Sequence, residues 1–341
     1  MTGIAGARHR WGLWAERLGL PVLLLLIIAF FSILPASGKT FLTGQNIGVV
    51  LANQSVLLLV ALAVMIPLLT GSFDFSVGAT AVTCALVCTA LSTHAGLPLW
   101  VCIAAAVLTG AVIGTINGLL VSLLDLNAFV STLGVATLLG GLIQWYTHGQ
   151  PIILTDAAML SFGSGRLWGI PRVLLVVVVV AAAVWFLLGA TAYGRRMSAV
   201  GANPRAAVLV GLPRRRLVAS AFILSGLIGG IAGVVLSART GGANPDTGMG
   251  LLFPALAAAF LGSTAFSPGR FNTPGTIVGV LFLAVSVRSD PGGRAELGRR
   301  GLQRSGTHRG RGALHGAASQ HVGLRCGGPP RARAPATSSR A

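Results

Sequence analysis

Charged residues are scarce in this sequence. Asp, Glu, Lys and Arg make up 9% of the 341 residues, against about 25% in soluble globular domains. Acids are outnumbered by basic residues, 7 Asp and Glu against 25 Lys and Arg, and Lys39 is the single lysine. Hydrophobic residues make up 54% of the chain. This balance excludes an ordinary soluble domain and is typical of a polytopic membrane protein in contact with the lipid bilayer.

The sequence also lacks the motifs of several chemistries. G-x-x-x-x-G-K-[ST] does not occur, so the chain has no P-loop, and ATP would have to be used by another subunit. No acid pair, catalytic-triad spacing or Cys/His cluster is present. We therefore expect no catalytic residue, no metal site and no directly bound cofactor. Cys84, Cys88 and Cys102 lie in apolar stretches as small core residues.

Long apolar runs dominate what is present. A membrane-spanning helix needs about 17 to 25 mainly apolar residues. Two of the runs, 251–261 and 276–287, are short, and Pro254 lies inside the first of these. A re-entrant or broken helix is therefore the alternative to a span at these two places. The prediction is an all-α polytopic membrane protein with nine transmembrane helices, at 18–34, 49–69, 77–91, 97–124, 128–146, 173–193, 217–236, 251–261 and 276–287.

Basic residues near the span ends predict the orientation. Arg8, Arg10 and Arg17 place residues 1–17 in the cytoplasm as an N-terminal segment, which we interpret as leading into the first span and not as a signal peptide. Six crossings later, the arginine-rich loop 193–216 is again cytoplasmic. The transmembrane domain is expected to cover residues 18–287.

Residues 288–341 differ from the rest. They contain eleven arginines against two acids, Asp290 and Glu296, and no apolar periodicity. One interpretation is a disordered basic tail. The other, which we favour, is a frameshift, because moving the reading frame by one nucleotide can recover an apolar segment that would be a tenth span. The tail lacks aromatic residues, so we expect no nucleic-acid partner.

Two polar segments share one spacing. G-S-x-x-F-S-x-G occurs at residues 71–78 and again at 262–269, and such paired glycine-containing elements in two halves of a transporter point to the pathway. Two polar turns are the plainer interpretation. Asp74 is an acid beside a span, which is costly unless it is paired, hydrated or functional, although it could also cap a helix. The pathway candidates are Asp74, Phe75, Ser76, Asn127, Gln144 and Gln150.

Some of these candidates have plainer interpretations as well. Gln144 and Gln150 close the fifth span and could hydrogen-bond a sugar, but polar groups at this place more often belong to an interfacial belt, which is the interpretation that we favour. Asn127 also suits the start of a helix. Glycines at four-residue spacing predict close helix packing, namely Gly110, Gly114 and Gly118 in one span and Gly226 and Gly230 in another.

The loop 193–216 contains six arginines, so it cannot cross a bilayer. Its middle predicts a short helix capped by Asn203, with Pro204 in the first turn and an apolar stripe after it. A charged, partly apolar segment at a membrane face suits docking to a cytoplasmic partner. This pattern indicates a transport subunit driven by a separate protein.

Several blocks resemble one known family, the permease subunits of bacterial ATP-binding-cassette sugar importers of the ribose/xylose/galactose type. They cover about residues 18–287, and their order and spacing are fairly specific. The family's first block normally reads GGIDLSVG, whereas Ser72, Phe73 and Phe75 depart from it here. Phe271 and Asn272 also occupy positions that are usually small or polar. The matching blocks are TGSFDFSVGA, STLGVATLLGGL with GQPI, YGRRMSAVGANPRAAVLVGL, SGLIGGIAGVVLSART and LGSTAFSPGRFNTPGTIVG.

The resemblance implies a multi-pass protein of the bacterial cytoplasmic membrane that moves a monosaccharide. It implies a second permease subunit in a homodimer, two ATPase subunits on the cytoplasmic side and an extracytoplasmic sugar-binding protein. The coupling element entering the ATPase would comprise Gly201, Ala202, Asn203, Pro204, Arg205, Ala206, Ala207 and Gly211.

Two alternatives stay open. Permeases for an autoinducer or a nucleoside share most of these blocks. A secondary, ion-coupled transporter would need ionisable residues within its spans, and these are scarce here.

Overall fold

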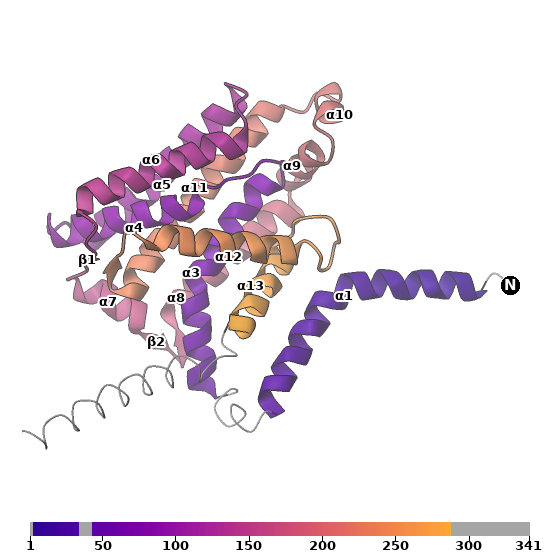
Figure 1. Cartoon of the computed structure of the whole chain (residues 1–341), viewed down its shortest axis with the longest axis horizontal. Coiled ribbons are helices and arrows are strands. Elements are labelled where there is room, and N and C mark those ends of the chain that lie inside the picture. Colours follow the sequence, from indigo (N-terminus) through magenta and orange to yellow (C-terminus); the bar gives the residue numbers. More distant parts are fainter. Residues whose placement is uncertain (1–2, 34–42, 288–341) are drawn as a thin grey trace, which may run out of the picture. The chain divides into compact units, whose positions relative to one another are not determined.

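The computed structural model of the chain describes residues 3–33 and 43–287. Helices make up most of the described chain, and the strands are short two-residue pairs (Figure 1). The helices are α1 (Gly3–Ile33), α3 (Gly44–Leu68), α4 (Val77–Thr93), α5 (Leu99–Ser122), α6 (Ala128–Thr147), α7 (Ala157–Ser164), α8 (Arg172–Trp185) with the π-helical turn η1 (Phe186–Ala190), α9 (Ala192–Ala202), α10 (Pro204–Leu209), α11 (Arg214–Thr240), α12 (Thr247–Gly262) and α13 (Thr273–Val287).

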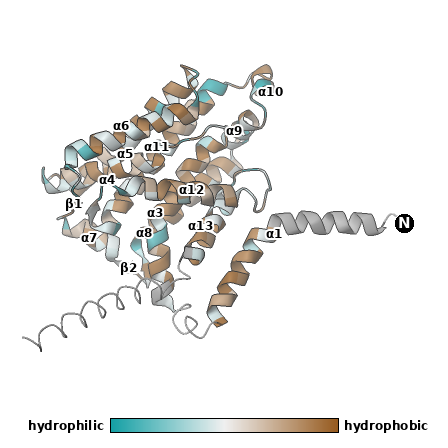
Figure 2. Cartoon of the chain, in the orientation of Figure 1, coloured by the Kyte–Doolittle hydropathy of each residue, from teal (hydrophilic) through white to brown (hydrophobic). Residues whose placement is uncertain are grey.

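The apolar helices confirm the predicted all-α polytopic fold. Within residues 18–287, five helices are long and apolar enough to cross a membrane and four more are apolar but shorter, which makes nine. They correspond one for one with the nine predicted segments. Helices α3, α12 and α13 are apolar over most of their length (Figure 2). The predicted tenth span and the tail 288–341 lie outside the described residues.

The structure does not show the alternative of a helix broken at Pro254. Helix α12 runs without interruption from Thr247 to Gly262, with Pro254 in its interior. Its 16 residues give a length of about 24 Å at 1.5 Å per residue, shorter than the ~30 Å hydrocarbon core. Helices α3, α4 and α13 pack against it, and this tertiary packing outweighs the loss of one backbone hydrogen bond.

The centre of the bundle is formed by α3 and α11. Residues 59–66 of α3 are each at most 1% exposed, so this stretch is buried on every side, as expected for a helix that is hydrophobic all round. Helix α11 packs against α3, α4 and α5. Phe222 of α11 is the largest of the fully buried side chains.

Helices α5 and α11 touch along their backbones. A Cβ atom added to Gly226 would lie 2.2 Å from the Gly110 carbonyl oxygen, and one added to Gly114 would lie 2.4 Å from the Phe222 carbonyl oxygen. Gly118 and Gly230 meet backbone atoms of the facing helix at 2.9 and 2.8 Å in the same way. The five predicted packing glycines therefore lie at one helix contact where no side chain fits.

The connections between helices gather at two ends of the bundle. At one, which we call the strand end, β1 (Ile152–Ile153) pairs with β4 (Gly242–Ala243), antiparallel. The Thr93 hydroxyl donates to the Ile153 carbonyl at 3.1 Å, which ties the end of α4 to the same place. The hairpin of β2 (Arg166–Leu167) and β3 (Ile170–Pro171) leads into α8.

At the other end, which we call the arginine end, lie the connections 69–76, 123–127, 191–213 and 263–272. Gly71, Gly201 and Gly269 line one cavity of about 310 Å³ there. Residues of the two G-S-x-x-F-S-x-G copies are thus neighbours in space, although they are almost two hundred positions apart in the sequence. The connections alternate between the two ends, as expected of successive crossings.

Candidate functional site

The predicted short helix of the basic loop is present as α10. The Asn203 side-chain oxygen accepts a hydrogen bond from the Ala206 backbone N–H at 3.0 Å, and Pro204 occupies the first turn. Both are favourable at a helix start, because the first backbone N–H groups have no partner within the helix. The helix ends before Gly211, whose φ of +80° suits glycine.

Helix α10 turns an apolar surface outward. Val208, Leu209 and Val210 are 54%, 87% and 76% exposed, whereas Ala207 is buried. The segment from Ala202 to Ala206 is exposed as well. Apolar side chains this exposed, on a helix of a connection and not of a span, mark a surface on which another molecule can pack.

Gly201 attaches α9 to the turn after α3. A Cβ atom at Gly201 would lie 2.1 Å from the Leu69 carbonyl oxygen and 3.3 Å from the Gly71 nitrogen. Only glycine permits this backbone approach. The candidate coupling segment therefore touches the turn that leads into Asp74.

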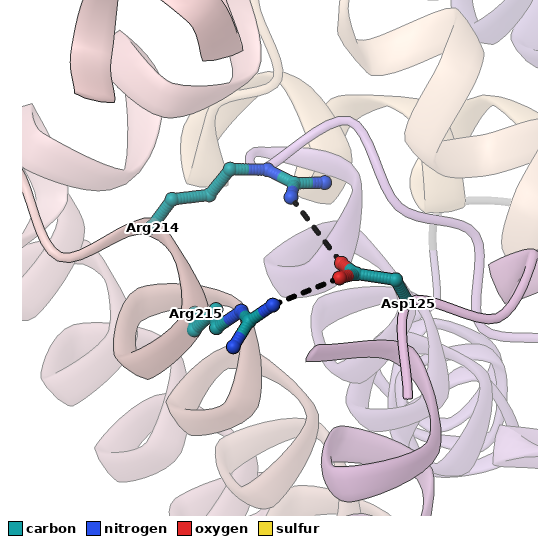
Figure 3. A network of polar contacts seen from close by, with 3 residues as sticks. All are labelled: Asp125, Arg214 and Arg215. Carbon is teal, nitrogen blue, oxygen red and sulfur yellow. Dashed lines mark hydrogen bonds and ion pairs between the residues drawn. The ribbon is translucent and has the colours of Figure 1, made fainter. Parts of the chain in front are cut away.

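An ion-pair network holds the α5–α6 connection to the start of α11 (Figure 3). Asp125 Oδ2 lies 3.0 Å from an Arg215 guanidinium nitrogen, and Asp125 Oδ1 lies 3.7 Å from one of Arg214. All three side chains are between 43% and 62% exposed, so each pair contributes at most about 1 kcal/mol. The network links the two connections at the point where the basic loop ends.

Asp74 is buried among hydroxyl and amide groups. The Ser76 backbone N–H and hydroxyl donate to Asp74 Oδ1 at 3.0 and 2.7 Å, and the Ser225 hydroxyl donates to Oδ2 at 3.1 Å. Asn117 of α5 donates to the Ser76 hydroxyl at 2.7 Å. Burial raises the pKa of the Asp74 carboxyl, and the hydrogen bonds from Ser76 and Ser225 act in the opposite direction.

This arrangement favours the structural interpretation of Asp74 and Ser76. Their hydrogen bonds to Asn117 and Ser225 join the start of α4 to α5 and α11. Phe75, between them, lines a cavity.

A cavity of about 350 Å³ lies between α4, α6 and the start of α12. Its volume falls at the lower end of the ~300–1,000 Å³ typical of small-molecule sites. It extends along α6 from the level of Phe75, near the arginine end, to Asp246 at the strand end. The other lining residues are mainly apolar or small, namely Ala79, Val82, Ala136, Thr137, Gly140, Ile143, Pro245, Gly248, Met249 and Leu252.

The structure separates the remaining pathway candidates. Gln144 donates to the Asp246 carboxylate at 3.0 Å and so lies beside the cavity. Asn127 is the N-cap of α6 at the arginine end, accepting from the Phe129 N–H at 2.9 Å, and exposed Gln150 lies beyond the other end of α6. These two residues are thus at opposite ends of one helix.

Sequence reasoning missed three of these residues. Asp246 lines the cavity, as does Thr137, and Asn117 completes the Asp74 cluster. Asp246 could have been found as one of only five acids before residue 288. Asn117 is an amide within an apolar helix, which is a signal in itself. Among the described residues, no group of three or more His, Cys, Asp or Glu could hold a metal ion.

Comparisons with known proteins place the chain in a family. The model of the family described as "Branched-chain amino acid transport system / permease component" matches residues 46–291. The L-arabinose ABC transporter permease protein AraH of Azospirillum brasilense is 30% identical over 284 residues, 83% of each chain. No solved structure matches the chain at a significant level.

Two ribose permeases are also similar. The ribose import permease protein RbsC of Escherichia coli K12 is 32% identical over 285 residues, which is 82% of this chain and 87% of the relative. RbsC of Bacillus subtilis is 35% identical over 271 residues, 79% and 83% of the two chains. Together with the nine apolar helices, these matches show that the chain is a multi-pass protein of the cytoplasmic membrane and belongs to the branched-chain amino acid transport system permease family, among the permeases of ABC sugar importers.

Proposed function

We propose that the chain is the transmembrane permease subunit of an importer that moves a monosaccharide, of the ribose or xylose kind, into the cell. A separate ATPase subunit supplies the energy, a binding protein delivers the sugar at the outer face, and a second copy of the chain completes the transporter. Relatives named for ribose, L-arabinose, D-allose and galactofuranose transport support a sugar as the solute.

The observation that supports an ATPase partner is the exposed apolar surface of α10. Three exposed apolar side chains, Val208, Leu209 and Val210, lie next to Arg205 on a connection between spans. Apolar anchors beside a basic residue suit a groove with an apolar floor and an acidic rim. The proposed coupling segment therefore comprises Gly201 to Ala207 together with these three residues and Gly211.

A displacement of α10 can be transmitted through α9 to the turn that follows α3. Helix α9 continues into α10 at Asn203, and Gly201 at its end touches the turn at Leu69 by backbone contact. Because a backbone contact cannot be relieved by a change of rotamer, displacement of α9 also displaces this turn. Rigid-body movement of this kind would switch the pathway between outward and inward access.

Uptake of radiolabelled sugar tests the proposal. Cells that produce the chain with its cognate ATPase and binding protein should take up ribose or xylose, and Leu209→Asp should abolish both uptake and copurification of the ATPase. A nucleoside that competes for uptake, when no pentose does, would replace sugar as the proposed solute. Uptake by the purified chain in vesicles without an ATPase would contradict the proposal.

The matched control is Leu160→Asp on α7, a partly exposed leucine at the strand end. It introduces the same charge far from α10 and should leave ATPase copurification unchanged. If both variants lose the ATPase equally, the docking surface is not α10.

A further inference from the structure

Five phenylalanine rings form a continuous chain at the arginine end. The ring of Phe129 on α6 meets that of Phe75 edge to face at 4.8 Å between centroids, and Phe75 lies 6.1 Å from Phe73. Phe73 stacks at 6.2 Å on Phe260 of α12, and Phe260 meets Phe271 edge to face at 5.4 Å. Such pairs are each worth about 0.5–1.5 kcal/mol beyond their buried area.

These rings lie at the arginine end of the 350 Å³ cavity. Phe75 is both a member of the chain of rings and a lining residue of the cavity. The carboxylate of Asp246 is at its other end, where Gln144 hydrogen-bonds it, and the Thr137 hydroxyl lies on α6 between the two ends. The cavity therefore offers hydrogen-bonding groups at one end and aromatic faces at the other.

The segment that carries Phe73 and Phe75 is held from both sides. Asp74, between the two rings, is 2% exposed and hydrogen-bonds Ser225 of α11, while Phe73 is 39% exposed. On the ring side, the Phe75 backbone N–H donates to the Thr132 hydroxyl of α6 at 3.0 Å. These hydrogen bonds therefore anchor the segment to α6 on one side and to α11 on the other.

The same segment starts at the turn that Gly201 touches. Leu69 and Gly71 lie against Gly201, and Phe73 follows two residues later. The aromatic chain is thus linked to the candidate coupling segment through a few residues of continuous backbone.

We propose that the five rings form a gate that closes the cytoplasmic end of a sugar pathway between α4, α6 and α12. This inference rests on the proposed function, because the occupant is a monosaccharide whose hydroxyls bind Thr137, Asp246 and Gln144 and whose apolar ring face packs on Phe75. Movement of α9 through Gly201 separates Phe73 from Phe260, and the sugar passes between α6 and α12.

Thiol labelling tests the gate without requiring transport. Gly140 lines the cavity, and a Cβ atom there would meet no atom within 4 Å, so Gly140→Cys places a thiol in the pathway. The background carries Cys326→Ser, and the remaining thiols, Cys84, Cys88 and Cys102, are buried. The purified chain is inserted in vesicles and treated from each face with a membrane-impermeant, negatively charged methanethiosulfonate.

Adding Phe73→Leu and Phe75→Leu should accelerate labelling from the cytoplasmic face about tenfold, since the lost ring pairs shift the open population by that order. Labelling from the outer face should not change. The control is Phe253→Leu, a 61% exposed phenylalanine of α12 outside the chain of rings, which should label as the parent does.

Equal cytoplasmic labelling rates in the parent and the double variant would overturn the gate. Should the double variant not fold, Phe73→Leu alone carries the same test, because Phe73 is the link between the two halves of the ring chain. Absence of sugar uptake by the complete wild-type transporter would overturn the proposed function instead, and the labelling result would still decide whether the rings close the cavity.

Discussion

Single glycines fix the distance between the two central helices. At Gly226 and Gly110, each backbone occupies the space that a methyl group on the other would need. The remaining contacts along α5 and α11 repeat this arrangement. In lipid, where apolar side chains gain little by leaving the solvent, close backbone packing of this kind is a main source of helix association.

We therefore expect Gly226→Ala to destabilise the bundle by about 1–3 kcal/mol, the usual cost of overpacking. Gly134→Ala is the matched control, since a Cβ at Gly134 on α6 meets no atom within 4 Å, and replacing a helical glycine there should be neutral or slightly stabilising. Thermal unfolding of the detergent-solubilised protein measures both. Equal midpoints for Gly226→Ala and the wild type would contradict the close approach.

At the scale of elements, the start of α11 is coupled to the α5–α6 connection by charge. Asp125 has a φ of +50°, an unusual conformation for a residue other than glycine, and its two carboxylate oxygens face Arg214 and Arg215. Arginines in the first turn of a helix are unfavourable next to its dipole. A carboxylate opposite them offsets that cost.

A double-mutant cycle between Asp125→Ala and Arg215→Ala should give a coupling energy of about 0.5 kcal/mol at low salt. The coupling should fall as salt is added, because the groups are about half exposed. Arg216→Ala is the control, because Arg216 lies in the same turn and the ion pairs of Asp125 are with Arg214 and Arg215. A coupling that does not change with salt would mean that the pair interacts by packing and not by charge.

The sequence predicts the elements of this fold better than their contacts. Apolar length places all nine spans to within a few residues, and the cap at Asn203 places α10. Long-range contacts leave no such local signal. Thr132 and Phe75 are 57 positions apart, and Gln144 and Asp246 are 102 apart. The sequence therefore does not distinguish the pathway candidates Asp74 and Gln144, although Asp74 is 2% exposed and Gln144 hydrogen-bonds a residue that lines a cavity.

For the whole molecule, the two ends of the bundle define the sidedness of the chain. The arginine end gathers Arg195, Arg205 and Arg214 to Arg216, and basic connections favour the cytoplasm. The strand end contains the β1–β4 pair and the exposed Trp168. We expect these two ends to lie on opposite sides of the membrane.

Cysteines at Leu209 and Trp168, which are 87% and 93% exposed, test this topology. In the Cys326→Ser background, Trp168→Cys should react with an impermeant maleimide in intact cells, and Leu209→Cys only after the cells are opened. Cells that carry only the buried thiols Cys84, Cys88 and Cys102 provide the blank. Reaction of Leu209→Cys in intact cells would invert the topology and remove the basis for a cytosolic ATPase at α10.

The exposed apolar surface of α10 affects how much of the chain accumulates in the cell. A chain synthesised in excess of its partner presents Leu209 and its neighbours to the aqueous phase, and unsatisfied apolar surfaces of this kind attract chaperones, proteases and other copies of themselves. The cellular abundance of the chain should then track the supply of its partner, whatever its rate of translation. The ratio of the subunits would thereby be set after synthesis, by degradation of chains that have no partner.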